Sequence, residues 1–497
     1  MKLTSVASLA VVAIFAGVAA TLAWQSRDWP LVHDAPILHY IAWRISQGAV
    51  PYRDLFDMNF PGAYLLHLAV LRGLGPGDAA WRVFDLAWLT ATSLAIAAFV
   101  APWGAVAATG SALLFATYHL AGGAWVAGQR DFLLCLFLVL AAFGVARWLE
   151  QRSWWSPVLS GLVLGAAATI KPHVLVLAVT FPLLMVWNGH HSKGPVVSSV
   201  AAFSMSLAVA PLVTTAWLAS HGAIGAWREI VLDYLLPLYA RLGTSDDWAF
   251  WRWQVWIGLA AAVGLSLARV VMAGRFGGRH LVALIGVGYG LFHFVGQAKG
   301  WEYHLYPLAA FCSVLAFAGF DPALERLPRR ASTPVLRPVT TLALSAVLGF
   351  SAVLLDVRGT EAARPSWIQK KERRVAEVAA WLAPRTTPGD SVQILDTSEG
   401  GAHVLLLLGV AEPTRFLYDF HFYHDAESPV ILRLRAEFIQ NLDAHPPRWV
   451  VLFERGWPTG GYERVERFPE LRDRLVARYH LAVRGDGWLI YARRDDS

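Results

Sequence analysis

The sequence predicts a polytopic α-helical membrane protein followed by a smaller C-terminal α/β domain outside the membrane. Of its 497 residues, 56% are hydrophobic and 16% are charged, and the mean hydropathy is +0.45. This composition is far too apolar for a soluble chain of such length. Long apolar runs extend to about residue 356, and alternating charged and apolar residues follow. We therefore expect a transmembrane domain at 1–356 and a C-terminal domain at 357–497.

Runs of about 20 apolar residues, the length that crosses a bilayer, predict about eleven transmembrane helices. They are expected at 4–24, 80–100, 103–120, 131–148, 156–171, 173–188, 196–219, 253–272, 280–297, 303–320 and 336–356. The fifth and sixth runs are short and meet at Lys171-Pro172, so one kinked helix is an alternative there. The first run has a basic start like a signal peptide, but its length favours a retained span.

Loops rich in Arg and Lys predict the topology. They are "RWLEQRSWW", "NGHHSKG", "AGRFGGRH" and "LERLPRRAST". The positive-inside rule places these loops and the N-terminus in the cytoplasm. The opposite, outer face then carries 25–79, 121–131, 220–252, 297–304 and the C-terminal domain. The net charge of +6 therefore reflects topology, and no nucleic-acid partner is expected.

The first outer loop, 25–79, is expected to contain two short helices. The stretches "PILHYIAWRISQG" and "PGAYLLHLAVLRGLG" have apolar residues at helical spacing and end at Gly48 and Gly75. Polar interruptions indicate that both helices lie along the membrane surface. In 220–252, "WREIVLDYLLPLYARLG" predicts another interfacial helix before a Trp-rich approach to the next span.

Strand-like and helical stretches alternate in the C-terminal domain. The runs "SVQILD", "RWVVLF" and "GWLIYARR" predict strands, and "WIQKKERRVAEVAAWLA" predicts a helix. The two cysteines, Cys135 and Cys312, both lie in apolar runs of the membrane domain. No disulfide framework is expected.

Most of the unusual polar side chains collect on the predicted outer face. The candidate site residues are Asp34, Asp54, Asp57, Arg130, Lys171, Lys299, Trp301, Glu302, Tyr303 and His304. Any single ionisable group at a bilayer boundary can simply anchor its helix by snorkelling. Carboxylates and several cations on one face, however, suit a reaction that needs a base and an anion clamp. A phosphate anchored in lipid presents its charge at this depth.

The chemistry that fits these groups is sugar transfer from a polyprenyl phosphate. The acceptor hydroxyl group loses a proton as it attacks the anomeric carbon, so a nearby carboxylate serves as general base. The leaving phosphate gains negative charge, which Arg or Lys side chains stabilise. The sequence has no P-loop and no G-x-G-x-x-G between strand and helix, which is consistent with a donor that carries no nucleotide.

The stretch "HDAPILHYIAWRISQGAVPYRDLFDMNFPGAYLLH", followed by "AAWRVFDL", resembles the first outer loop of the GT-C glycosyltransferases. Among these it is similar to the protein O-mannosyltransferases and the lipid A aminoarabinose transferase. The stretches "GLVLGAAATIKP" and "GQAKGWEYHLYPL" look like later family segments. The resemblance implies a GT-C-like fold and an inverting enzyme that uses a polyprenyl-phosphate sugar. It also implies that Asp34, the acidic residue after the first span, is the general base.

The chain departs from the family pattern at two places. Many relatives have an Asp-Glu pair where this chain has Asp34-Ala35, and several have a basic residue before the proline that here follows Asn59 and Phe60. Substitutes for the phosphate clamp are therefore expected among Arg130, Lys171, Lys299 and His304. Sugar or acceptor contacts are expected from Asp54, Asp57, Trp301, Glu302 and Tyr303.

Structural alternatives stay open for several of these residues. Asp34 precedes a Pro-initiated helix and is also a good N-cap. Asp54 and Asp57 suit an Asx turn, and Arg130 can pair with the adjacent Asp131.

No cofactor is expected to be required. A divalent cation on Asp34, Asp54 and Asp57 is conceivable but not favoured, because no fixed ligand spacing is present. In "YDFHFYHDAESP", His421 and His424 match no strong metal template, and a surface loop is expected, whose aromatic and acidic character could help to hold a sugar acceptor.

The resulting hypothesis is an enzyme on the outer face of a bacterial cytoplasmic membrane. Its partners are a polyprenyl-phosphate sugar donor, membrane lipid, and a glycan, lipid or protein acceptor of the cell envelope. One rival is a transporter or lipid-linked flippase, which more often has paired halves with broken helices and ionisable groups near mid-membrane. Another is an O-antigen polymerase or ligase, which is distinguished by a large central outer loop.

Overall fold

The structure, a computed structural model, describes residues 3–189, 195–244, 253–325, 336–387 and 389–494. The Trp-rich approach at 245–252 and parts of the loops "NGHHSKG" and "LERLPRRAST" lie outside the described residues. The chain divides into two compact units. The helical unit comprises Met1–Trp29, Asp78–Thr214 and Ser245–Arg364, and the sheet unit comprises Pro30–Gly77, Thr215–Thr244 and Pro365–Ser497.

Long apolar helices make up the helical unit. They are α1 (Leu3–Gln25), α4 (Asp78–Val100), α5 (Ala105–Leu120), α6 (Arg130–Gln151), α7 (Trp155–Ile170), α8 (Leu175–Gly189), α9 (Val196–Ser220), α11 (Trp253–Met272), α12 (Gly278–Gln297), α13 (Tyr306–Ala316) and α14 (Leu336–Ala362). Eight helical spans of the described chain are long and apolar enough to cross a membrane, and three shorter apolar helices complete the expected set. The polytopic membrane fold is thus confirmed.

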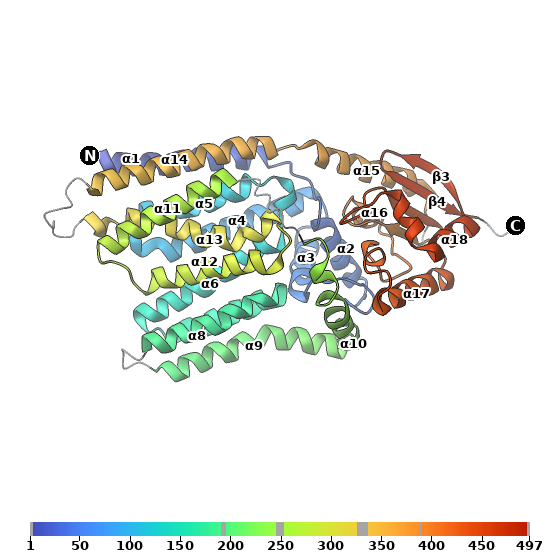
Figure 1. Ribbon diagram of the computed structural model, residues 1–497, viewed down its shortest axis with the longest axis horizontal. Coiled ribbons are helices and arrows are strands. Elements are labelled where there is room, and N and C mark those ends of the chain that lie inside the picture. The colour runs from blue at the N-terminus through green and yellow to red at the C-terminus, as the bar shows by residue number, and fades with distance from the viewer. Residues whose placement is uncertain (1–2, 190–194, 245–252, 326–335, 388, 495–497) are drawn as a thin grey trace. The chain divides into compact units, whose positions relative to one another are not determined.

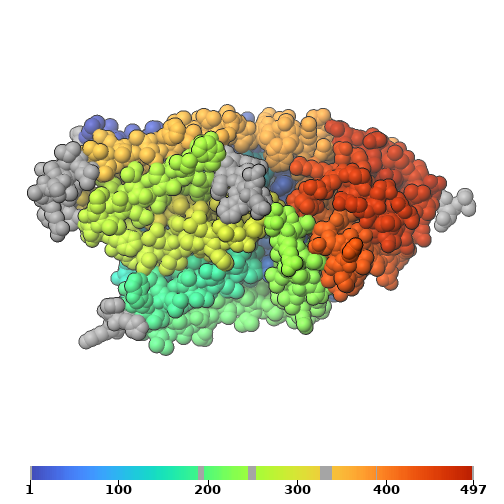
Figure 2. Space-filling model, viewed as in Figure 1, coloured from blue at the N-terminus to red at the C-terminus, as the bar shows by residue number. Residues whose placement is uncertain are grey.

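Helices distant in sequence pack side by side in this unit. The first helix, α1, packs against α14 and α5 (Figure 1). Figure 2 shows α11 and α14 lying against each other along the same side of the unit. The apolar N-terminal run is therefore an integral part of the helix packing.

The fifth and sixth predicted spans are two separate helices. Helix α7 ends at Ile170, and Lys171 adopts an extended conformation with φ −144° and ψ 105°. A proline disfavours the helical conformation of the residue before it, which explains the break at Lys171. One 3-10 turn, Pro172–Val174, then leads into α8.

A four-stranded sheet in the order β1-β2-β4-β3 forms the centre of the sheet unit. Its strands are β1 (Val392–Leu395), β2 (Trp449–Phe453), β3 (Tyr479–Gly485) and β4 (Trp488–Arg493). The pair β1 and β2 is parallel, and the other two pairs are antiparallel. The three predicted strands are confirmed, whereas β3 was missed. The sequence feature that could have revealed β3 is Asp486-Gly487, a two-residue sequence typical of the turn of a β-hairpin.

All three segments of the sheet unit also contribute helices. They are α2 (Ala35–Ser46), α3 (Pro61–Gly73), α10 (Ile224–Arg228), α15 (Ser366–Leu382), α16 (Gly401–Leu408), α17 (Pro429–Ala444) and α18 (Pro469–Arg478). Helix α16 packs against α2, α15 and β1. The helices expected in the first outer loop are confirmed as α2 and α3, and the glycines that follow them, Gly48 and Gly75, have φ values of 95° and 103°. The helix expected in 220–252 corresponds to α10, which continues as a π-helix, Glu229–Leu235, and its interfacial position stays a prediction.

A fully buried arginine, Arg464, joins the ends of two strands. Its guanidinium group donates hydrogen bonds to the carbonyl oxygens of Leu395 (3.2 Å) and Phe453 (2.7 Å), at the ends of β1 and β2. Its charge is paired with Asp419 at 2.7 Å. A buried charge is tolerated only when it is paired and hydrogen-bonded in this way.

Candidate functional site

A buried carboxylate, Asp131, organises a polar cluster in the helical unit. Asp131 lies in the first turn of α6 and is 0% exposed. The Lys171 Nζ atom lies 2.8 Å from both of its carboxylate oxygens. The ring of His293 contacts the same carboxylate through Nε2. The extended Lys171-Pro172 break thus brings the lysine to the start of α6, where its ammonium group pairs with the buried carboxylate of Asp131.

One face of α12 completes this cluster. Tyr289, His293 and Gln297 are spaced four residues apart and therefore share one side of the helix. The Gln297 Oε1 atom accepts a hydrogen bond from Lys171 at 3.4 Å. The Tyr289 hydroxyl group lies 3.0 Å from Nδ1 of His173, whose ring stands 4.3 Å from that of His293. Sequence analysis missed Tyr289 and His293, although polar residues at this spacing in an apolar helix are a recognisable signal.

The loop after α12 carries the predicted residues of "GQAKGWEYH". Ala298 and Gly300 both have positive φ values, 51° and 66°, which turn the chain sharply after Gln297. His304 is 2% exposed, and its ring lies 5.7 Å from that of His293. The rings of Trp301 and Tyr303 lie 5.4 Å and 4.8 Å from that of His304. The structure therefore brings Lys171, His304, Trp301 and Tyr303 to one cluster.

Two further predicted residues of this loop are buried. Lys299 is 7% exposed and Glu302 is 5% exposed. Burial lowers the pKa of Lys299 to about 8, so its ammonium group is held in a poorly solvated place. An anion that reached Lys299 would relieve this penalty. The role of Lys299 and Lys171 in a phosphate clamp stays a prediction.

Arg130 lies directly before Asp131 at the N-terminus of α6. Asp131 is paired with Lys171 at 2.8 Å, and the local ion pair considered for Arg130 and Asp131 stays a prediction. Backbone N–H groups and the helix dipole at a helix N-terminus also favour an anion. The role of Arg130 in a phosphate clamp stays a prediction.

A second buried network in the helical unit was not expected from the sequence. Asp85, in "AAWRVFDL", is fully buried and is paired with Arg82, one helical turn away. It also accepts hydrogen bonds from the Gly128 backbone (2.9 Å) and from His119 Nε2 (3.1 Å). His119 Nδ1 lies 2.8 Å from the Tyr306 hydroxyl group. These contacts tie α4, α5 and α13 together and give the network a structural role.

The predicted base, Asp34, lies in the sheet unit at the N-terminus of α2. It occupies the N-cap position, but its side chain makes no capping hydrogen bond to the helix. The side chain is 23% exposed, and its Oδ1 lies 3.7 Å from Nε2 of His33. The geometry thus does not support the capping alternative for Asp34.

The carboxylates of Asp54 and Asp57 are engaged within the sheet unit. Asp54 accepts a hydrogen bond from the Val50 backbone at 2.8 Å and pairs with Arg53, whose hydrogen bond lowers the pKa of Asp54. Asp57 is 1% exposed. It accepts hydrogen bonds from the Asn59 backbone and from the hydroxyl groups of Tyr64 and Tyr418. These contacts match the Asx turn considered as the structural alternative for Asp54 and Asp57. Sugar binding by either aspartate stays a prediction.

The histidines of "YDFHFYHDAESP" meet one tyrosine. The Tyr234 hydroxyl group, on the π-helix, lies 2.7 Å from His421 Nδ1 and 2.9 Å from His424 Nε2. His421 is fully buried, and burial lowers its pKa well below the usual value. His421 therefore belongs to the core rather than to the surface loop expected from the sequence.

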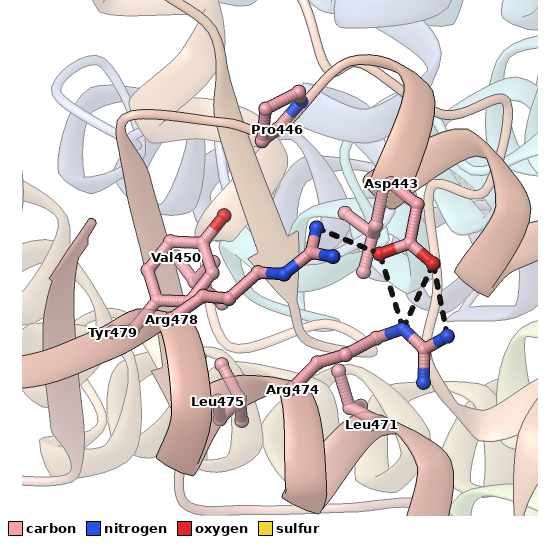
Figure 3. Close-up of a pocket in the computed structure, with 9 residues that line it drawn as sticks. Asp443, Pro446, Val450, Leu471, Arg474, Leu475, Arg478 and Tyr479 are labelled. Carbon is pink, nitrogen blue, oxygen red and sulfur yellow. Dashed lines mark hydrogen bonds and ion pairs between the residues drawn. The ribbon is translucent and has the colours of Figure 1, made fainter. Parts of the chain in front are cut away.

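A surface hollow in the sheet unit has Leu471, Leu475 and Val450 in its lining (Figure 3). At its edge, Asp443 is held between Arg474 at 2.9 Å and Arg478 at 3.0 Å. Because the carboxylate is neutralised by its neighbours, we assign no binding role to this hollow. Among the residues that the structure describes, no group of three or more His, Cys, Asp or Glu side chains is arranged to hold a metal ion. Whether the chain requires a metal stays a prediction.

Two crystal structures are similar to the chain along almost its whole length. The structure of ArnT from Cupriavidus metallidurans bound to undecaprenyl phosphate has a TM-score of 0.58 and 14% identity, covering 98% of each chain. The chain has the ArnT fold. Apo ArnT from the same organism gives a TM-score of 0.58 and 13% identity, covering 97% of each chain. Similarity to ArnT confirms the expected fold, a polytopic helical membrane protein with a C-terminal sheet domain. No family model and no curated protein matches the sequence.

Proposed function

We propose that the chain is an inverting membrane glycosyltransferase that moves one sugar from a polyprenyl-phosphate donor to an acceptor hydroxyl group. The observation that carries this proposal is the ArnT fold over 98% of the chain, since one of the ArnT structures holds undecaprenyl phosphate. The cluster of buried cations and aromatic rings around Asp131 supports it independently. A lipid-linked monophosphate requires a cationic group at the membrane boundary and an apolar path for its tail.

The proposed reaction assigns a role to each part of the candidate site. The acceptor oxygen attacks the anomeric carbon while its proton passes to the carboxylate of Asp34. The bond between the anomeric carbon and the phosphate oxygen breaks, and polyprenyl phosphate leaves with its electron pair. Arg130, Lys171, Lys299 and His304 are proposed to stabilise the leaving phosphate. Trp301 and Tyr303 provide an aromatic platform for the sugar or the lipid.

The proposed site is on the outer face of a bacterial cytoplasmic membrane, with the N-terminus in the cytoplasm. Arg275, before α12, and Lys370, on α15, are both exposed, which makes them suitable positions for a topology test. In intact spheroplasts, a membrane-impermeant maleimide should label a Lys370→Cys variant but not an Arg275→Cys variant. The reverse labelling pattern would contradict the proposed orientation.

A donor survey tests the enzymatic proposal. Purified protein in lipid nanodiscs is incubated with synthetic polyprenyl-phosphate sugars and a mixed set of glycan, lipid and peptide acceptors. The expected result is release of polyprenyl phosphate and a product whose anomeric configuration is inverted. Absence of binding and turnover with every donor would overturn the proposal. Movement of a lipid-linked donor across proteoliposomes without transfer would favour the flippase alternative.

A further inference from the structure

The environment of Asp34 contains a feature that the sugar-transfer proposal does not use. His33, the residue before Asp34, has a φ of 66°. A non-glycine residue in this left-handed region is strained and persists only where its surroundings hold it. The imidazole ring of His33 is held from α15, where the ring of Trp367 stands edge-on to it at 6.1 Å.

A second contact from α15 determines which ring nitrogen of His33 carries the proton. Lys371 Nζ lies 3.5 Å from His33 Nδ1, at the long end of the hydrogen-bond range. An ammonium group has three donors and no acceptor, so in this contact Nδ1 must accept. A neutral imidazole that accepts at Nδ1 carries its proton on Nε2. The Nε2 atom is the one that faces Asp34 Oδ1, at 3.7 Å.

Lys371 is itself fixed by its remaining contacts. Its side chain is 7% exposed, and Nζ donates to the Ser398 carbonyl oxygen at 2.7 Å and approaches Glu399 Oε1 at 3.4 Å. The ammonium group also lies 5.3 Å from the centre of the Trp367 ring. Three acceptors therefore match its three donors, which leaves the lysine little freedom to turn away from His33.

Further charged side chains lie around the pair formed by Lys371 and Glu399. Glu399 is paired with Arg374, and Arg455 approaches it at 3.9 Å. Among the described contacts, Asp34 and Lys371 face His33 directly, while Glu399, Arg374 and Arg455, from α15 and the loops after β1 and β2, surround the ammonium group of Lys371. A second proton on Nδ1 would place two cations in contact, so Lys371 disfavours the doubly protonated ring.

We propose that Lys371 and His33 are positioning residues for Asp34. Lys371 fixes the imidazole in the tautomer whose Nε2–H points at the carboxylate, and this N–H dipole favours the ionised form that a base requires. The inference rests on the proposed role of Asp34 as general base. It adds that a residue of α15, Lys371, favours the ionised form of Asp34 before an acceptor binds.

A spectroscopic experiment tests the tautomer without any substrate. Full-length protein labelled with 15N-histidine is examined at neutral pH, and the His33 signals are assigned from a His33→Asn variant. Asparagine tolerates the left-handed backbone, so this variant keeps the local fold. The expected result is a protonated Nε2 and an unprotonated Nδ1 for His33 in the wild type. In Lys371→Met the ring should lose this preference, and in Lys371→Arg it should keep it. A proton on Nδ1 in the wild type would overturn the inference.

Turnover measurements then separate this inference from the proposed function. Lys371→Met and His33→Asn should each lower kcat about 10-fold with little change in KM, and the double variant should lose no more than either alone. Lys370→Met, at the exposed neighbour on α15, should keep wild-type kcat. Additive losses in the double variant would show that the two residues act independently, and would contradict the proposal that Lys371 acts on Asp34 through His33. If no variant and no wild-type sample shows turnover, the proposed function fails while the tautomer result still decides the inference.

Discussion

Lys171 and Asp131 form an ion pair in which the ammonium nitrogen lies 2.8 Å from each carboxylate oxygen. The pair joins the start of α6 to the break between α7 and α8, two places that are 40 residues apart. His293 on α12 contacts the same carboxylate. Asp131 therefore joins α6, the break between α7 and α8, and α12 within the candidate site. Its first role is therefore to maintain the geometry of that site.

Substituting Asp131 by Asn should destabilise the helical unit. The change leaves Lys171 and His293 without their carboxylate, and removing one partner of a buried pair costs about 3–5 kcal/mol. We expect a clear fall in Tm, measured by thermal unfolding in detergent. Asp28→Asn is the matched control, because Asp28 pairs with Arg27 at a site where both side chains are about half exposed, and such pairs contribute less than about 1 kcal/mol. Equal Tm losses for the two variants would contradict the structural role of Asp131.

Phosphate binding should weaken as the pH rises through about 8. Burial lowers the pKa of Lys299 to about 8, so the ammonium form that attracts a phosphate is lost above that pH. A phosphate monoester is already a dianion there, since its second pKa is about 6. The affinity for undecaprenyl phosphate should therefore fall between pH 7 and 9, as measured by microscale thermophoresis. Lys299→Arg should abolish this pH dependence, because arginine stays charged. A wild-type affinity that does not change with pH would exclude Lys299 from the clamp.

Gly165 should not tolerate a side chain. A Cβ atom at Gly165 on α7 would lie 2.2 Å from the carbonyl oxygen of Leu207 on α9, a contact that the backbone cannot relieve locally. Gly161, one turn earlier, is equally close to the Phe203 carbonyl oxygen, which is the close helix approach that small residues permit in membranes. Gly165→Ala should lower stability by about 1–3 kcal/mol. Gly264→Ala is the control, because that position has open space and the change should be neutral or stabilising. Unchanged thermal unfolding of Gly165→Ala would contradict the α7–α9 contact.

Glu412→Gln should stabilise the sheet unit relative to the wild type as the pH rises. Glu412 is 6% exposed, and burial raises its pKa well above the usual value, against the opposing hydrogen bond from the Ile394 backbone. The folded protein then keeps a proton that the unfolded chain loses above pH about 4. The contribution of Glu412 to the stability of the wild type is fully present below that pH and is lost as the pH rises through the folded pKa. Glutamine does not titrate, so the Tm difference between variant and wild type should grow with pH. A difference independent of pH would show that Glu412 is ionised in the folded state.

The membrane architecture could be predicted from the sequence because lipid imposes a simple rule. A spanning helix must be apolar for about 20 residues, and the observed helix α6 (Arg130–Gln151) contains the predicted run 131–148. The break at Lys171 follows equally from the local chemistry of Pro172. Strand β3 was missed because adjacent residues such as His480 and Leu481 are both exposed, so the strand lacks a clear alternation of buried and exposed residues.

The candidate site could be predicted only in part, because its partners come from distant helices. The spacing in "GQAKGWEYH" identified Lys299, Trp301 and His304, which are neighbours in sequence. The pairing of Asp131 with Lys171 and His293 depends on how α6, α7 and α12 pack, and no local pattern encodes that packing. The contact of His33 with Lys371 joins residues 338 positions apart, so it was equally invisible in the sequence.

The role of Asp34 is tested by measuring donor affinity and turnover on the same Asp34→Asn sample. An amide cannot accept the proton of the acceptor hydroxyl group, and a general base contributes about 10²–10⁴-fold to the rate. We expect kcat to fall by about that factor while the Kd for the polyprenyl-phosphate sugar stays within about twofold of the wild type. Wild-type turnover by the Asp34→Asn protein would show that Asp34 is not the base and would contradict the proposed mechanism.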